Sequence, residues 1–212
     1  MITFKSTAKQ KFRIDYNKQF IIEQLFADPK MLDVHVQKIK SVYKDASDNF
    51  IRNQIDHIII KENAFNEVMK YLVSLFEFSF DASEVQSFKN KLKESMKNLN
   101  DSQSEDLAKK LIQKGLIFKV LSNENKIQVS DEDAKKYLDQ YYRTTNNSVN
   151  EFLNNKERFE EIKDIILEEK ITQWIISKFK IALTIQNILN RQVPLKDQTP
   201  PPPPPVGPAI KK

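Results

Sequence analysis

The sequence predicts an all-α protein, an elongated multi-helix body with long helical arms. Apolar residues recur at steps of three and four along most of the 212 residues, the period of an amphipathic helix. The chain has only two glycines, Gly115 and Gly207, whereas compact β folds use glycine freely in turns and bulges. The apolar stripes are long and narrow, which favours helices that pack as arms or hairpins.

Composition excludes several classes of function. The chain has no cysteine, so a disulfide framework, a cysteine-based zinc site, an iron–sulfur cluster and a thiol nucleophile are all excluded. A P-loop or a dinucleotide fingerprint needs several glycines close together, which this chain lacks. No apolar run approaches the ~20 residues of a membrane span, and the N-terminus lacks the apolar region of a secretion signal. We therefore expect a soluble, cytoplasmic protein with no membrane partner.

The net charge of +5 is concentrated at the two ends of the chain. Residues 1–60 carry ten basic and seven acidic side chains, and residues 181–212 carry four and one, a net +3 in each case. Residues 61–180 carry twenty basic and twenty-one acidic side chains. Only five of the 34 cations are arginine, the residue that makes bidentate contacts to bases and phosphates. We therefore expect no nucleic-acid partner.

Three regions differ in composition. We expect a basic lead-in at residues 1–16, a helical domain at residues 17–193 and a proline-rich disordered tail at residues 194–212. The run Pro200–Pro205 predicts a solvated polyproline II helix. A stiff extension without a partner is the preferred interpretation, and a ligand for an aromatic groove is the alternative.

The first half of the helical domain predicts an arm. A short helix is expected over Asn17–Ala27, and Asp28-Pro29 then supplies a cap and a first helical residue. The apolar stripe that follows predicts one long arm helix over about 29–60. Its length, about 1.5 Å per residue, is large for a compact domain.

The body, at about 62–190, contains several helix signals. Asp81 with Glu84, and Ser130 with Asp133, have the spacing of capping residues. The alternating stretch Phe76–Phe80 predicts an extended linker. Gly115 falls on the apolar side of its helix, where it costs about 1 kcal/mol against alanine, and close approach of a neighbouring helix would compensate. A last long helix is followed by a shorter segment through Ala182, Ile185 and Leu189.

No group of residues predicts catalysis, a metal or a cofactor. His35 and His57 fall on one predicted helix about 33 Å apart, so they cannot share a site, and replacing both should leave function unchanged. The acidic run from Glu157 to Glu169 contains no histidine and is interleaved with lysine, so a salt-bridged surface explains it better than a di-metal site. The acids Asp131–Asp133 open a helix, where the macrodipole favours them. We expect no enzyme.

A longer pattern resembles a known family. It runs through Asp106-Leu107-Ala108-Lys109-Lys110, Gly115-Leu116-Ile117 and Phe152-Leu153-Asn154-Asn155-Lys156-Glu157, and closes with Ile165–Ile171 and Ile175–Ile181. In order and spacing this is similar to the C-terminal, substrate-binding domain of bacterial trigger factor, which is related to the core of the periplasmic chaperone SurA. The resemblance is most specific over residues 104–182 and extends collinearly from about residue 30.

The resemblance implies a helical body whose arms hold unfolded, partly folded or nascent polypeptides without ATP. Two other activities of trigger factor are not implied. The stretch Lys11-Phe12-Arg13-Ile14 lacks the glycine and proline of the family's ribosome-docking loop, and the chain has neither the length nor the glycines for a prolyl-isomerase domain. We therefore expect a stand-alone bacterial holdase.

Client binding, in this hypothesis, involves aromatic residues that fall off the main stripes or near helix ends. These are Phe76, Phe78, Phe80, Tyr142, Phe152 and Phe179. Each of them is equally well explained as part of the core. Two other functions stay open: a structural or scaffolding protein that binds one specific partner and, with less support, a nucleic-acid-associated helical protein.

Overall fold

Helices form most of the structure, which confirms the all-α class. The computed structural model describes residues 4–96, 98–143 and 150–184, of which residues 140–143, 150 and 151 are described by their backbone only. The helices are α1 (Pro29–Val42), α2 (Asp48–Ser74), α3 (Ala82–Ser95), α4 (Asp101–Glu124), α5 (Asp131–Arg143), α6 (Asn150–Leu153) and α7 (Lys156–Lys178). Four short strands accompany them: β1 (Thr7–Gln10), β2 (Gln19–Ile22), β3 (Phe76–Ser79) and β4 (Lys180–Leu183).

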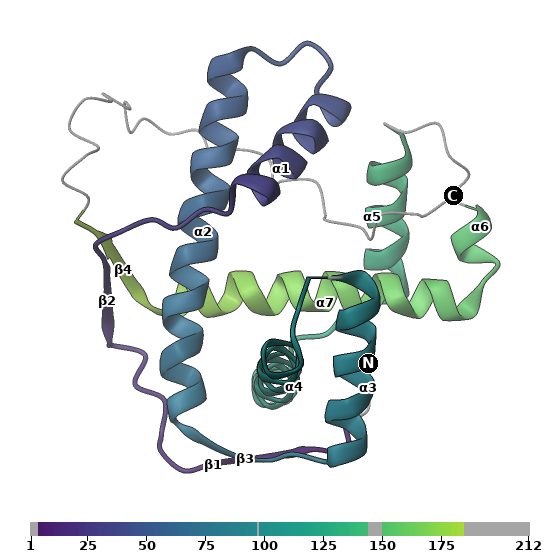
Figure 1. The fold of residues 1–212 in the computed structure, drawn as a ribbon. Helices are drawn as coiled ribbons and strands as arrows, with labels where there is room; N and C mark the ends of the chain where they lie inside the picture. The colour runs from purple at the N-terminus through teal and green to yellow at the C-terminus, as the bar shows by residue number, and fades with distance from the viewer. Residues whose placement is uncertain (1–3, 97, 144–149, 185–212) are drawn as a thin grey trace.

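The helices α2, α4 and α7 contact one another at the centre, and the other helices extend from them (Figure 1). The hairpin of α1 and the first half of α2 projects to one side of α7. The helices α5 and α6 pack on the other end of α7, and α3 packs on α4. The result is an open arrangement with arms, as the narrow apolar stripes predict.

The apolar interior is divided into three clusters. The largest joins α2, α4, α7 and β2 around Val68, Leu121 and Ile175. A second lies between α3 and α4, and a third joins α5 to the first half of α7. Among the described residues of α1, only His35 and Ile39 are buried. The α1 arm is therefore attached with little burial of its own.

The helix expected over Asn17–Ala27 is wrong. Residues 19–22 form β2, which pairs in parallel with β4, Phe20 facing Ile181 in the register. The apolar positions that we assigned to a helix also fit a strand, because burial alternates along β2, with Phe20 and Ile22 inside. The partner strand is some 160 positions away, so no local signal reveals it.

The basic lead-in is part of the fold. Residues 7–10 form β1, which pairs antiparallel with β3, and Ile14 is buried in the central cluster. The stretch Phe76–Phe80 is extended, as expected, but it is a paired strand rather than a linker. The shorter segment expected after α7 begins as β4. Ile185, Leu189 and the tail at residues 194–212 lie outside the described residues.

The single arm helix over 29–60 is also wrong. The chain forms two helices, with a break between Val42 and Asp48, where the Ser47 Oγ accepts a hydrogen bond from the Phe50 backbone N–H at 3.3 Å. The Tyr43 and Phe50 rings pack edge to face at 5.1 Å across the break. The apolar stripe continues through the turn because the two helices of the hairpin face each other, and α2 then runs on to Ser74.

Most of the expected helix starts are confirmed. Asp28 caps α1 and Pro29 follows it, and the Ser130 Oγ accepts from the Asp133 N–H while Asp133 accepts from the Ser130 N–H. The neighbour that crowds Gly115 is not a helix. It is the Phe4 ring, which a Cβ at position 115 would overlap.

Candidate functional site

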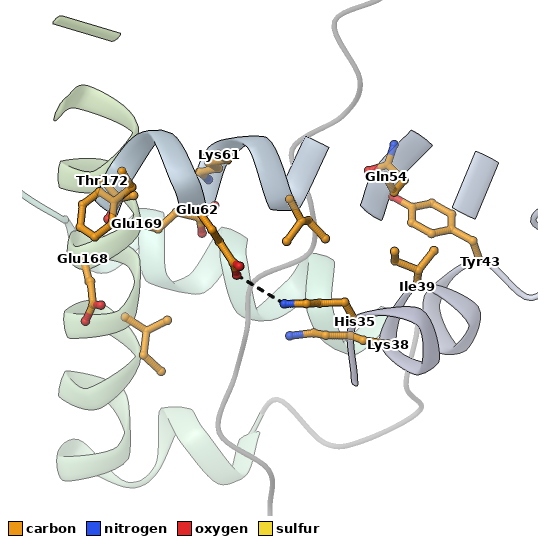
Figure 2. Close-up of a pocket in the computed structure, with 13 residues that line it drawn as sticks. His35, Lys38, Ile39, Tyr43, Gln54, Lys61, Glu62, Glu168, Glu169 and Thr172 are labelled. Atoms are coloured by element: carbon orange, nitrogen blue, oxygen red, sulfur yellow. Dashed lines mark ion pairs between the residues drawn. The ribbon is translucent and has the colours of Figure 1, made fainter. Parts of the chain in front are cut away.

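An apolar groove opens where α1, α2 and α7 face one another (Figure 2). Its volume is about 410 Å³, and it is open to solvent. The apolar lining comes from all three helices: Ile39 of α1 and Tyr43 at its C-cap, Ile58 and Phe65 of α2, and Ile165 of α7. The polar lining consists of His35, Lys38, Gln54, Lys61, Glu62, Glu168, Glu169 and Thr172.

The α1 wall of the groove is positioned by a buried amide. Asn63 of α2 accepts a hydrogen bond from the Phe26 backbone N–H at 3.0 Å and donates one to the Phe26 carbonyl at 2.8 Å. Its amide also donates to the Ile59 carbonyl at 2.8 Å. The chain is thus fixed to α2 just before the cap at Asp28. This contact aims α1 along α2, with His35 and Ile39 turned inward.

The charges at the rim are mixed in sign. Burial lowers the pKa of Lys38, and the nearby Glu169 carboxylate partly opposes that shift. Glu168 forms an ion pair with Lys114, whose ammonium lies 5.3 Å from the Phe118 ring centroid and 5.8 Å from that of Phe65. The groove therefore presents no uniform field of one sign.

One residue that lines the groove has a buried polar atom without a hydrogen bond. His35 is 8% exposed, and its Nε2 lies 3.4 Å from the Glu62 Oε1 (Figure 2). Within the described part of the chain, this nitrogen has no hydrogen-bond partner. The separation of about 33 Å between His35 and His57 that a single helix implies does not apply, because the two residues lie on different helices.

The aromatic residues predicted for client binding lie elsewhere. Phe76 and Phe179 are buried in the central cluster. Phe78 lies between Phe76 and Phe80, with ring centroids 6.2 and 6.1 Å away, and is partly buried. None of the predicted residues whose side chains are described lines the groove.

The remaining two predicted residues belong to the α5–α7 side of the molecule. Phe152 packs against the cluster between α5 and α7, and the Arg158 guanidinium lies 5.9 Å from its ring centroid. Tyr142 is in the last turn of α5, and its side chain lies outside the described part of the chain. Phe76 lies in β3, which pairs with β1, and Phe179 immediately precedes β4, so both rings lie in the central cluster rather than at the groove.

Sequence reasoning missed the residues that line the groove. His35, Ile39 and Tyr43 fall within the apolar stripe that predicts the arm helix, but a stripe by itself predicts only a packed face. The signal that could have revealed the groove is a difference in area: the apolar stripe is larger than the surface that packs against it. A narrow stripe on a hairpin leaves part of the apolar face uncovered, and here that part faces α7 across the groove.

Further apolar surface lies beside the groove at the start of the arm. Phe26 is 73% exposed, Val34 56% and Met31 47%. Met31 and Val34 are three positions apart on α1 and share its outer side. The arm therefore carries apolar side chains both on its groove wall and at its base.

Comparison with known proteins identifies the family. The family model of the bacterial trigger factor protein C-terminus matches residues 36–177, which include the second half of α1, all of α2 and all but the last residue of α7. The chain belongs to this family. The match thus covers most of the arm hairpin and the α7 wall.

Relatives of this family member extend over nearly the whole chain. The uncharacterized protein MG377 of Mycoplasma genitalium is 35% identical over 182 residues, which are 85% of this chain and 94% of that protein. Its homologue in Mycoplasma pneumoniae is 36% identical over the same shares. The crystal structure of the hypothetical Mycoplasma protein MPN555 is similar with a TM-score of 0.77 and 35% identity, and it matches 86% of this chain and 93% of that one.

Two other kinds of site are absent from the described residues. None of the helices described is long and apolar enough to cross a membrane. The described histidine, aspartate and glutamate side chains form no cluster of three or more that could hold a metal ion.

Proposed function

We propose that this protein is an ATP-independent chaperone, a holdase that binds unfolded or partly folded polypeptides in the groove between α1, α2 and α7. The observation that carries the proposal is the open, apolar-lined groove of about 410 Å³. Membership of the trigger factor C-terminal family supports it, because domains of this family are of the chaperone type and non-catalytic.

The groove suits weak and general binding. Each apolar side chain of a client that the groove buries contributes about 1.5–3 kcal/mol before ordering costs. The exposed residues Phe26, Met31 and Val34 offer further apolar contacts beside it. Contacts spread over the arm and α7 give broad specificity, because no single contact is decisive.

The test is protection of clients from aggregation. We expect the protein to suppress aggregation of two unrelated denatured proteins without nucleotide, at low and at high salt. Ile58→Ser should weaken protection because it places a hydroxyl in the apolar lining. Leu111→Ser is the matched control, since Leu111 is an exposed apolar residue of α4 that does not line the groove.

Other results would favour the other functions. Saturable binding of one partner, without protection of unrelated clients, would indicate a scaffolding protein. Affinity for nucleic acid that falls steeply with salt would indicate phosphate contacts. Equal protection by the wild type and Ile58→Ser would remove the groove from the mechanism.

A further inference from the structure

The chain leaves β4 beside the segment that leads into the arm. β2 and β4 are parallel neighbours, and the Thr184 backbone N–H donates to the Ile22 carbonyl at 3.1 Å (Figure 1). From Ile22 to Phe26 the chain advances four residues, which span at most about 14 Å. The Phe26 backbone is hydrogen-bonded to Asn63, which is next in sequence to Glu62 of the groove lining. The residues that follow Thr184 therefore start within reach of the groove.

The sequence after Thr184 is apolar at regular intervals. Ile185, Leu189 and Val193 follow one another at steps of four, and Ile188 is next to Leu189. In a helix, this spacing places the four side chains on one face, as in an apolar client segment. Residues 185–193 lie outside the described part of the chain. Nine residues, extended, span about 30 Å, which covers the path through Ile22 and Phe26.

The groove matches residues 185–193 in polarity and in charge. Its inner lining is mainly isoleucine and aromatic, and its rim carries a small acidic excess: Glu62, Glu168 and Glu169 against Lys38 and Lys61. Arg191 is the one charged residue of the sequence 185–193. The apolar side chains of the segment thus fit the lining, and its single positive charge is opposite in sign to the excess at the rim.

A segment of the same chain needs little affinity to fill the groove. A tethered ligand within reach of its site has an effective concentration of about 1 mM. With a Kd of about 0.1 mM, it would fill the groove in about 90% of the molecules. An external client must displace it, and the apparent Kd of that client rises about tenfold.

We propose that residues 185–193 occupy the groove of their own molecule and that clients bind by displacing them. Ile185, Ile188, Leu189 and Val193 contact the apolar lining, and Arg191 faces the acidic rim. This inference rests on the proposed function and adds its regulation, because the groove is covered until a client with stronger apolar contacts arrives. Weakly apolar chains are then excluded, and the lining is not exposed as a patch that draws copies of the protein together.

The first experiment measures binding of a labelled leucine-rich peptide to the full chain. Ile188→Ser combined with Leu189→Ser removes two apolar contacts of the competing segment, so peptide binding should become about five- to tenfold stronger. Val206→Ser should leave the affinity unchanged. It is the matched control, because Val206 is an apolar residue beyond the polyproline run. Unchanged or weaker peptide binding by the double variant, with a circular dichroism spectrum like that of the wild type, would overturn the inference.

A synthetic peptide of residues 184–195 gives a second measurement that does not depend on the double variant. At about 1 mM it should displace the labelled peptide from the wild type, and Ile58→Ser should weaken its binding. Failure to displace the labelled peptide would also overturn the inference, whereas protection of clients by the wild type would leave the proposed function standing. Absence of labelled-peptide binding to both the wild type and the double variant, without protection of clients, would overturn the proposed function itself.

Discussion

Glu84 joins the N-terminal segment of the chain to the start of α3. It is buried at the start of α3, and its carboxylate accepts from the Lys5 N–H at 3.0 Å and the Ser6 N–H at 2.9 Å. The sequence predicts Glu84 as half of a capping box with Asp81. Only the Asp81 half forms, with the Glu84 N–H donating to the Asp81 Oδ1 at 2.9 Å. A capping pattern in the sequence identifies the residues of the cap. It cannot show that the glutamate carboxylate instead accepts hydrogen bonds from a backbone segment distant in sequence.

This contact predicts an acid-sensitive contribution to stability. Burial alone would raise the pKa of Glu84, but the hydrogen bonds from Ser6 and Lys5 outweigh burial, and the pKa lies below its ordinary value. Because the folded pKa is the lower one, the contribution is present above the unfolded pKa and is lost as pH falls through the folded pKa. Glu84→Gln should cost about 1–3 kcal/mol at neutral pH, since its amide N–H₂ cannot accept.

Urea unfolding at neutral pH and at about pH 3 checks the prediction. The difference in free energy of unfolding between wild type and Glu84→Gln should be smaller at the lower pH. Glu77→Gln is the control, an exposed glutamate paired with Lys11, whose loss should cost about 0–1 kcal/mol. A difference in free energy of unfolding that stays constant with pH would mean that the charge of Glu84 contributes nothing to stability.

At the scale of elements, local signals were predictable and distant pairing was not. The caps at Asp28 and Ser130 depend on residues within three positions, so the sequence shows them. The pairing of β2 with β4 depends on residues at the other end of the domain. The break after Val42 was hidden because the stripe runs unbroken from one hairpin helix into the next. Apolar periodicity reports which face is buried, and it does not report whether the helix turns back.

The hairpin predicts a local effect of Asn63. Replacing Asn63 by alanine removes its hydrogen bonds to the Phe26 backbone and leaves the partly buried N–H and carbonyl of Phe26 without this partner, at a cost of about 1–3 kcal/mol. Because α1 buries little else, we expect the loss to appear as opening of α1. Amide hydrogen exchange should quicken in α1 and stay unchanged in α4.

The hairpin variant also connects stability to the groove. The affinity of Asn63→Ala for a client peptide should fall together with the protection of the α1 amides from hydrogen exchange, because α1 supplies one wall of the groove. Asn17→Ala, an exposed asparagine before β2, is the control. Uniformly faster exchange in α1 and α4 would show that Asn63 supports the whole fold rather than the arm.

At the scale of the molecule, the groove lies between parts that are packed separately. Its α7 wall carries Ile165, which packs against the cluster shared with α5, whereas its α1 wall packs on α2. The family resemblance anticipated arms around a binding surface. It could not show which side chains stay uncovered, because that depends on how far α1 stands from α7. Of the aromatic residues proposed from sequence, Phe76 and Phe179 lie in the core, whereas the groove is lined by Ile39, Ile58 and Ile165 together with Tyr43 and Phe65.

This arrangement predicts that holding α1 to α7 stops client binding. The chain has no cysteine, so Lys38→Cys with Glu169→Cys places two unique thiols on opposite walls of the groove. A short bismaleimide that joins them should weaken peptide binding more than about tenfold, equivalent to about 1.4 kcal/mol, by filling and closing the space. Circular dichroism should stay unchanged, because neither side chain belongs to an apolar cluster.

Each single cysteine variant, treated with the same reagent, is the control. It shows how much of the lost peptide binding comes from the reagent blocking one wall and how much from closing the groove. Peptide binding by the joined protein at the strength of the single variants would show that clients are held elsewhere, and the exposed base of the arm at Phe26, Met31 and Val34 would then be the surface to test.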